Sequence, residues 1–338
     1  IPRKRGFDAM LPSDWSAAHG WQGWLEPHEY PRILNPDSGR IWTANARVTD
    51  GDALRLIGDG GYDLGARAQQ IRDALFASDT FSPEDMLAIQ YDDRALFLAP
   101  WRELLLGLLD EDAVRGDAEL AEYRDLVFDW KPRAAPDSVG YRLVRAFRLE
   151  IKQRVFHALT APAREVYGDK VTLRISNQFE GPLWSLVTER PMHMLPAGYQ
   201  SWDEFMLAAV RENLDWFGNN FDGPLTERTW GERNTASIRH PLSGNVPLLG
   251  ARLDMPEDRL NGDLDMPKAQ GPTFGASQRY AVYPGDEANS ILHMPTGQSG
   301  HPLSDFYDRG HDDWVDGRPN PFLPGAAAFT LTLRPDKR

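Results

Sequence analysis

The composition and hydrophobic periodicity of this 338-residue chain change twice along its length, and the order of the three regions limits the folds that it can adopt. Residues 1–63 are rich in Pro, Gly, Trp and Asp, with turn signals every few residues, which predicts loops and short strands. Apolar residues then recur at helical spacing through residues 64–225, and proline- and glycine-rich segments return over residues 226–338. This order predicts an α+β fold in which both ends share one sheet and a helical insertion packs against it.

The helical pattern divides into separate segments with recognisable start signals. Ser82-Pro83-Glu84-Asp85 combines a serine cap, a proline at the first helical position and acidic residues near the positive end of the helix dipole. In the last third of the chain, alternating and β-branched residues predict strands in QRYAVYP, SILHMP and AFTLTLRP. The predicted helices cover residues 64–77, a segment that begins at Ser82, and residues 100–109, 117–130, 138–159 and 201–218.

Charge and composition exclude several classes of function. The chain carries 37 basic and 50 acidic residues, a formal net charge of −13, so phosphate repulsion argues against a nucleic-acid partner. It contains no cysteine, which excludes disulfides, thiolate nucleophiles and cysteine-bound metal sites. Because no run of about 18 apolar residues occurs, we expect no membrane span.

Two acidic stretches contain potential metal ligands, but neither matches an established ligand spacing. HPLSDFYDRGHDDW fits no zinc pattern, and solvated acidic residues around a tryptophan explain it equally well. TDGDALRLIGDGG hints at a calcium loop, yet the glycine and acids are missing at EF-hand spacing, so ordinary turn chemistry explains it better. The potential ligands in the first stretch are His301, Asp305, His311, Asp312 and Asp313.

Two further polar stretches have a structural explanation beside a catalytic one. Ser299 lies in GQSG, which invites comparison with a hydrolase nucleophile elbow. The G-x-S-x-G spacing is absent and His301-Pro302 follows in place of a helix, which favours a tight turn. TWGERNTASIRHPLSG either lines a groove or forms a satisfied polar network in the core. Its polar side chains include Arg233, Asn234, Arg239 and His240.

Longer motifs near both ends are similar to those of one enzyme family. WQGWLEPHEYPRILNPDSGRIWTANARV contains a glycine-tryptophan turn, the pattern P-x-x-x-N-P-x-S-G and then an asparagine. HMPTGQSGHPLSDFYDRGHDDWVDGRPNPFLPG contains Gly-Gln-Ser-Gly followed by P-L-S-x-x-Y. The chain resembles the penicillin acylase family of N-terminal-nucleophile hydrolases over nearly its whole length, most weakly in residues 80–225. The likeness is to the C-terminal part of the large (beta) subunit, and it implies part of an αββα sandwich with a helical insertion.

The resemblance also implies the chemistry and two site residues. In that family a serine at the first residue of the large subunit, exposed by self-cleavage of a precursor, is the nucleophile, and its own α-amine is the base. A backbone N–H and an asparagine side chain hold the oxyanion, and an arginine lies near the site. The matching positions here are Asn45 and, at the family's separation, Arg67 in GARAQQIR. A neutral, rigidly held amide stabilises developing negative charge without reorganising. On the residues alone, Asn45 reads as a turn or capping residue and Arg67 as a solvated helix residue.

Residue 1 is isoleucine, so by this resemblance the chain lacks the family's nucleophile. We therefore expect a fragment of an amidohydrolase that cleaves the amide of an N-acylated small molecule and is inactive alone. The companion chains of the same precursor would be the small subunit and the serine-bearing N-terminal part of the large subunit. The resemblance implies the periplasm, no cofactor for the chemistry and a structural calcium ion. One calcium ligand would align with Leu56, near Asp52 and Asp59, and is not assigned.

Two rival functions also fit the sequence, and the substrate is open. A non-catalytic periplasmic binding or scaffold protein would keep the acylase fold without the chemistry. A carbohydrate-active protein has only the eleven tryptophans in its favour. β-Lactams, acyl-homoserine lactones and acyl-peptides all stay open as substrates, because the residues that would grip an acyl chain are not in this sequence.

Overall fold

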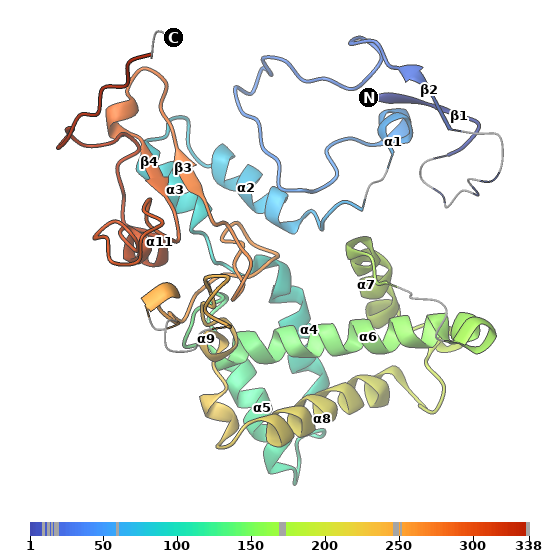
Figure 1. The fold of residues 1–338 in the computed structure, drawn as a ribbon. Coiled ribbons are helices and arrows are strands. Elements are labelled where there is room, and N and C mark those ends of the chain that lie inside the picture. Colours follow the sequence, from blue (N-terminus) through green and yellow to red (C-terminus); the bar gives the residue numbers. More distant parts are fainter. Residues whose placement is uncertain are drawn as a thin grey trace.

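The computed structural model describes residues 1–8, 11, 14, 16, 20–58, 61–168, 174–245, 250 and 252–335. These residues are mainly helical, with two small sheets (Figure 1). The elements are β1 (Pro2–Arg5), β2 (Gly20–Trp24), α1 (Gly51–Ile57), α2 (Ala66–Phe76), α3 (Pro83–Gln90), α4 (Ala99–Leu108), α5 (Ala118–Phe128), α6 (Val139–Tyr167), α7 (Glu180–Glu189), α8 (Trp202–Asn220), α9 (Trp230–Arg233), β3 (Arg279–Ala281), β4 (Ile291–His293) and α11 (His311–Asp316).

The predicted helices are confirmed, and α3, α6 and α8 begin at local capping signals. Ser82 forms a capping box at the start of α3: its Oγ accepts from the Asp85 N–H at 3.1 Å, and Asp85 Oδ2 accepts from the Ser82 N–H at 2.9 Å. Ser138 and Ser201 cap α6 and α8 in the same way, each accepting a backbone N–H of the first turn. The turn prediction for residues 49–61 is wrong over Gly51–Ile57, which form α1.

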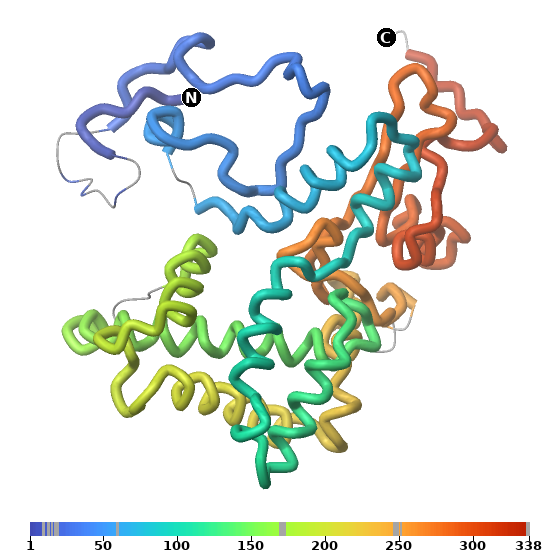
Figure 2. Tube along the Cα trace, turned by 180° about the vertical axis from the view of Figure 1, so that it is seen from behind, coloured from blue at the N-terminus to red at the C-terminus, as the bar shows by residue number. Residues whose placement is uncertain are grey.

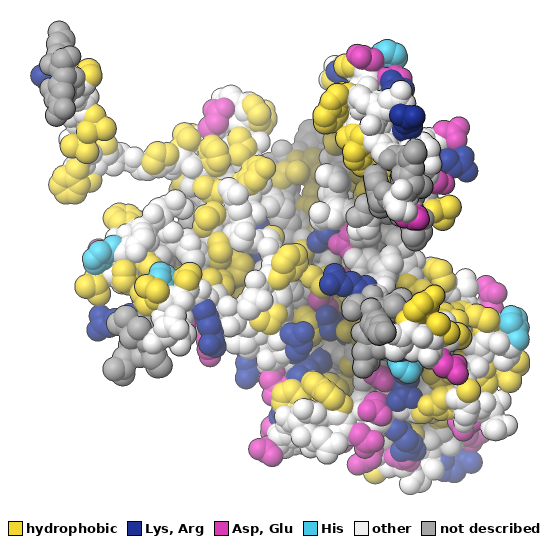
Figure 3. Space-filling model, turned by 45° about the vertical axis from the view of Figure 1, so that its right-hand side comes forward, with side chains coloured by type: hydrophobic (Ala, Val, Ile, Leu, Met, Phe, Trp, Pro, Cys, Tyr) yellow, Lys and Arg dark blue, Asp and Glu magenta, His cyan; other side chains and the backbone are white. Residues whose placement is uncertain are grey.

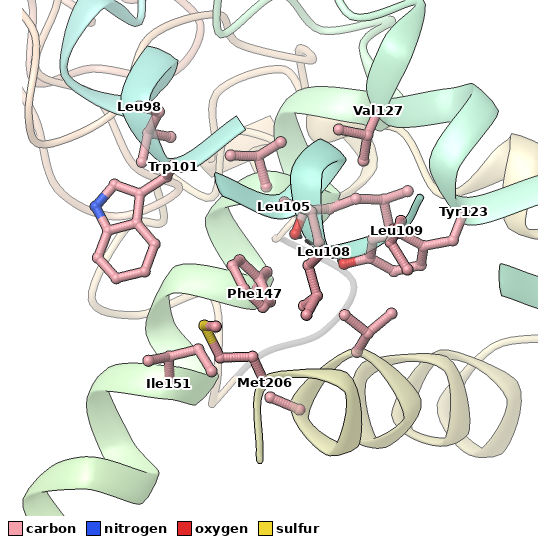
Figure 4. Close-up of a cluster of buried hydrophobic side chains, with 14 of the residues drawn as sticks. Leu98, Trp101, Leu105, Leu108, Leu109, Tyr123, Val127, Phe147, Ile151 and Met206 are labelled. Carbon is pink, nitrogen blue, oxygen red and sulfur yellow. Dashed lines mark hydrogen bonds between the residues drawn. The ribbon is translucent and has the colours of Figure 1, made fainter. Parts of the chain in front are cut away.

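The main hydrophobic core lies where α4, α5, α6 and α8 meet. Figure 4 shows Phe147 of α6 among the leucines of α4, with Met206 of α8 beneath it. Leu105, Phe147 and Met206 are completely buried. Burial of side chains of this size stabilises the fold by about 1.5–3 kcal/mol each. Helix α6 therefore lies at the centre of this core, in contact with α4, α5 and α8.

The expectation of one shared sheet is wrong for the described residues. β1 pairs antiparallel with β2 and β3 pairs antiparallel with β4, so each sheet joins segments that are near in sequence. Both ends of the chain do lie on the same side of the helical block (Figures 1 and 2). The described residues thus form no layered sandwich, and the division into 1–63, 64–225 and 226–338 stays a prediction.

Of the three predicted strands near the C-terminus, two are confirmed and one is not. QRYAVYP contains β3 and SILHMP contains β4, but AFTLTLRP forms no strand in the described residues. Its alternating apolar side chains stand 96%, 84% and 85% exposed at Phe329, Leu331 and Leu333. The apolar segment projects from the body in Figure 3. A strand requires a neighbour for its backbone hydrogen bonds, and the described residues place none beside this segment.

No helix among the residues that the structure describes combines the length and the apolar character that a membrane span requires.

Helices α5 and α6 approach closely at Gly140. A Cβ built at this glycine would overlap the carbonyl oxygen of Leu126 and the Cβ of Trp130. We predict that Gly140→Ala lowers the free energy of unfolding by about 1–3 kcal/mol, because the two backbones must separate. Gly218→Ala in α8 is the matched control, since a Cβ there meets nothing within 4 Å. The control should leave stability unchanged or raise it by about 0.5 kcal/mol. Urea unfolding measures both, and equal effects would contradict the close approach.

Lys268 is a buried cation with an unusual titration. Its side chain is 2% exposed, its Nζ donates to Asn261 Oδ1 at 2.5 Å, and it lies 4.1 Å from the ring centroid of Tyr91. Burial, and then the positive charge of Arg279, lowers the pKa of Lys268 to about 7. Below pH 7 the folded and unfolded states both carry this proton. Above pH 7 the unfolded state alone keeps it, up to its ordinary pKa of about 10.4.

The free energy of unfolding should therefore rise with pH from about 7 to about 10 through this residue. We predict that the stability difference between the parent and Lys268→Met changes in this window by up to about 1.4 kcal/mol per pH unit, in favour of the parent. Urea unfolding at a series of pH values measures it. A difference that stays constant between pH 7 and 10 would contradict the lowered pKa.

Candidate functional site

Asn45 lies at a sharp bend of the chain, where the backbone contacts the segment around Asp63. Its φ of 61° is left-handed, a conformation that asparagine tolerates better than most residues. Its carbonyl oxygen accepts the N–H of Asp63 at 2.8 Å, and Ala46 forms an isolated parallel bridge with Asp63. The backbone therefore brings the end of the SGRIWTANARV stretch against the segment that leads into α2.

Arg67, the second residue of α2, hydrogen-bonds to both of these segments through one nitrogen. Its Nη2 donates to the carbonyl oxygen of Ala44 at 3.0 Å, to Asn45 Oδ1 at 2.9 Å and to Asp63 Oδ2 at 3.0 Å. The arginine side chain is only 12% exposed, whereas the Asp63 side chain is 30% exposed. The two residues that the family resemblance singled out are thus in direct contact.

This contact fixes which way the Asn45 amide faces. A guanidinium group has only donors, so the amide atom that it holds is the oxygen Oδ1. Nδ2 then points the other way, and the described residues offer it no acceptor. Asn45 is exposed, so this donor reaches solvent. The adjacent positive charge polarises the amide and strengthens its N–H as a donor. The arrangement presents a neutral, oriented donor at the surface.

A third group in this site, Asp63, could not be recognised in the sequence. Its Oδ1 accepts from Asn177 Nδ2 at 2.8 Å, while Gln178 Nε2 donates to the carbonyl oxygens of Tyr62 and Asp63 at 2.9 and 3.2 Å. Asn177 and Gln178 open the short 3-10 helix η3 (Asn177–Phe179), which leads directly into α7. The one sequence signal was the spacing of Asp63 and Arg67 by one helical turn.

Comparison with known proteins places the chain in a family. The penicillin amidase family profile matches residues 1–330. This chain belongs to the penicillin amidase family. It is 30% identical over 336 residues to penicillin acylase 2 proenzyme of Pseudomonas sp. (strain SE83). The aligned region covers 95% of this chain and 41% of that protein. It is 25% identical to the acyl-homoserine lactone acylase QuiP of Pseudomonas aeruginosa, over 94% of this chain and 41% of that protein. QuiP of Pseudomonas fluorescens is also 25% identical, over 100% of this chain and 44% of that protein. The chain therefore spans about two fifths of the length of these relatives.

Family membership confirms the resemblance, and the structure brings Asn45 and Arg67 together, while their catalytic roles stay predictions.

The candidate metal ligands of the HPLSDFYDRGHDDW stretch do not form a metal site in the described part of the chain. Among the described residues, no group of three or more acidic or histidine side chains is arranged to hold a metal ion. His311 is 2% exposed and is bonded to the Pro295 carbonyl oxygen at 2.6 Å and to Asp258 Oδ2 at 3.1 Å. It is a core histidine.

The described residues near the family's calcium position give no ligand set either. Asp52 lies in α1 and forms an exposed ion pair with Arg55 at 2.9 Å. The Leu56 carbonyl oxygen accepts from Lys4 Nζ at 2.5 Å. Asp59 lies outside the described residues. The structural calcium ion stays a prediction.

The polar side chains of the TWGERNTASIRHPLSG and GQSG stretches lie in different surroundings. Asn234 is completely buried and donates to the carbonyl oxygens of Leu260 and Gly262, so it belongs to a core network. Arg239 instead lines a polar cavity of about 560 Å³, so both open interpretations of this stretch apply, to different residues. The other polar side chains of that stretch are Arg233, which is exposed, and His240, whose Nδ1 accepts from the Leu242 N–H. Ser299 lies in a tight turn, since its Oγ accepts from the His301 N–H at 3.1 Å.

The left-handed backbone at residue 45 can be tested by comparing two truncations. Asn45→Ala and Asn45→Gly both remove the amide and its bond to Arg67, but only glycine adopts φ 61° without strain. We predict that Asn45→Ala is less stable than Asn45→Gly by about 1 kcal/mol in urea unfolding. If the alanine variant is the more stable, residue 45 does not occupy the left-handed region.

Proposed function

We propose that this chain is part of an acylase that hydrolyses the amide bond of an N-acylated small molecule. The nucleophilic serine is supplied by a companion chain of the same precursor, and Asn45 donates to the oxyanion. Membership of the penicillin amidase family supports the reaction class. The single observation that carries the assignment of Asn45 is the orientation of its amide, whose oxygen is held by Arg67 at 2.9 Å.

The proposed reaction follows from where charge develops. The serine Oγ attacks the carbonyl carbon of the amide while the α-amine of the serine accepts the hydroxyl proton. The carbonyl oxygen becomes negative, and Asn45 Nδ2 donates to it without carrying a charge or acting as a competing base. Collapse of this intermediate expels the amine, which takes up the proton, and leaves an acyl-enzyme. Water then attacks the acyl-enzyme, releases the carboxylic acid and regenerates the serine.

Arg67 has a supporting role in this scheme. Its positive charge lies on the oxygen side of the Asn45 amide, so it orients the donor without binding the substrate. Its bonds to Ala44 and Asp63 hold the guanidinium in place.

The names of the relatives support a class of substrate for this chain. One carries the name penicillin acylase and two carry the name acyl-homoserine lactone acylase, and both names describe acyl amides of small molecules. We propose the same class here, with β-lactams, acyl-homoserine lactones and acyl-peptides as the compounds to assay. We also propose a periplasmic location and assembly with the small subunit and the serine-bearing part of the large subunit. The coverage of 41% of the first relative supports the existence of further chain parts.

The oxyanion role predicts the effect of a nearly isosteric change at residue 45. Asn45→Asp tolerates φ 61° and keeps an oxygen for Arg67, but it replaces the Nδ2 donor by a second carboxylate oxygen. In the assembled enzyme, we predict a fall of kcat by at least about 10²–10³ with an unchanged unfolding midpoint, because an oxyanion donor is lost. Hydrolysis of a panel of chromogenic N-acyl amides measures it.

A matched control exists in the same part of the chain. Asn35 also has a positive φ, 47°, and is exposed, so Asn35→Asp makes the same chemical change away from Arg67. It should retain the parent kcat. Mass spectrometry of the mature chains shows that each variant has completed precursor processing. Parent-like turnover by Asn45→Asp would reject the oxyanion role, and an inactive parent with a mature serine-bearing chain would favour the scaffold function.

A further inference from the structure

Among the described residues, the helices from α4 to α8 hydrogen-bond to the candidate site through one short segment, the start of α7. In Figures 1 and 2, α7 rises from α6 toward the part of the chain that contains α1 and α2. Asn177 and Gln178 stand at this end and bond to the loop before α2. This contact joins residues 114 positions apart, Asp63 and Asn177.

The two side chains fix different parts of that loop. Gln178 Nε2 holds the backbone, through the carbonyl oxygens of Tyr62 at 2.9 Å and Asp63 at 3.2 Å. Asn177 Nδ2 holds the carboxylate, through Asp63 Oδ1 at 2.8 Å, and the Leu64 N–H adds a second bond to the same oxygen at 3.1 Å. With Oδ1 held, the plane of the carboxylate is set. Oδ2 is then directed at Arg67.

The direction of Oδ2 matters because Arg67 Nη2 serves three acceptors with two hydrogens. A small movement of Asp63 therefore changes how those hydrogens are shared with Ala44 and Asn45. Arg67 is 12% exposed, so water does not readily replace a lost bond. The orientation of the Asn45 amide thus depends on the carboxylate of Asp63.

The start of α7 is itself rigidly attached to the hydrophobic core. Glu180 is 4% exposed and accepts from Trp101 Nε1 at 3.0 Å and from Arg148 at 2.8 and 3.0 Å. Leu183 and Val187, on the same helix, are completely buried. Asn177 is exposed, but it lies just before this fixed helix end. It therefore has little freedom to follow movements of the loop before α2.

We propose that Asn177 is a positioning residue for amide hydrolysis: it orients Asp63, which places Arg67, which aims the Asn45 amide at the oxyanion. This inference rests on the proposed function. It adds to the reaction a residue of the helical block that makes no contact with Asn45 among the described residues. Gln178 supports it by fixing the backbone of the same loop.

The test is a double-mutant cycle in the assembled, processed enzyme. We predict that Asn177→Ala lowers kcat by about tenfold, leaves KM unchanged and leaves the unfolding midpoint unchanged, since its side chain is exposed. In an Asn45→Gly background, the same substitution should lower kcat no further, because Asn177 acts only through Asn45. Asn220→Ala is the matched control, since it removes an exposed amide whose one bond among the described residues is to the Trp216 carbonyl oxygen within α8.

A second variant gives a readout that a merely structural role would not move. Asn177→Asp places a carboxylate against Asp63 Oδ1, and two facing carboxylates repel until they share a proton. The ratio of kcat for this variant to kcat for the parent should therefore rise as the pH falls from 8 to 5. A ratio that is flat in pH would contradict the proposal.

The outcomes separate this inference from the function on which it rests. If Asn45→Gly lowers kcat but Asn177→Ala has no effect, or the two losses multiply, Asn177 is not a positioning residue and the oxyanion role stands. If Asn45→Gly has the parent kcat, the proposed oxyanion role of Asn45 fails, and this inference fails with it.

Discussion

The candidate site depends on one nitrogen atom. Nη2 of Arg67 donates to two neighbouring oxygens of residues 44 and 45 and to the carboxylate of Asp63. Charge-assisted bonds of this kind are about twice as strong as neutral ones, and the low exposure of the arginine protects them from water. Without them, the Asn45 amide would be free to rotate on an exposed bend. With them, the bend presents a donor in one orientation, which is what electrostatic preorganisation requires.

The helical block gives this small cluster its rigidity. Helix α6 passes through the core and carries Arg148, which forms a buried ion pair with Glu180 at the start of α7 at 2.8 Å. Removing one partner of such a pair leaves a buried charge unpaired, so the contact keeps the end of α7 in one place. Asn177 and Gln178 pass that constraint to the loop before α2. Packing in the core and orientation of a surface amide are thereby linked through consecutive contacts.

How much of this was predictable from the sequence follows from the range of each interaction. Ser82, Ser138 and Ser201 act on N–H groups three residues away, so the helix starts were readable. Asn45 and Arg67 were found through family motifs, whereas periodicity alone gave them no role. Asn177 carries no local signal for its contact with Asp63, because the two meet only after α6 and α7 have packed. Residues 51–57 were misread because glycine and acidic residues suit a turn as well as a short helix. The strand predicted at AFTLTLRP failed because alternation shows that a segment can pair, and not whether a partner lies beside it.

The central claim is that Asn45 Nδ2 faces the oxygen on which negative charge develops. The most direct measurement is a crystal structure of the assembled enzyme with a tetrahedral sulfonyl or phosphonate adduct on the catalytic serine. We predict an adduct oxygen at about 2.7–3.1 Å from Asn45 Nδ2, with Oδ1 still bonded to Arg67. An amide turned away from the adduct, or an adduct oxygen bound wholly by other donors, would contradict it.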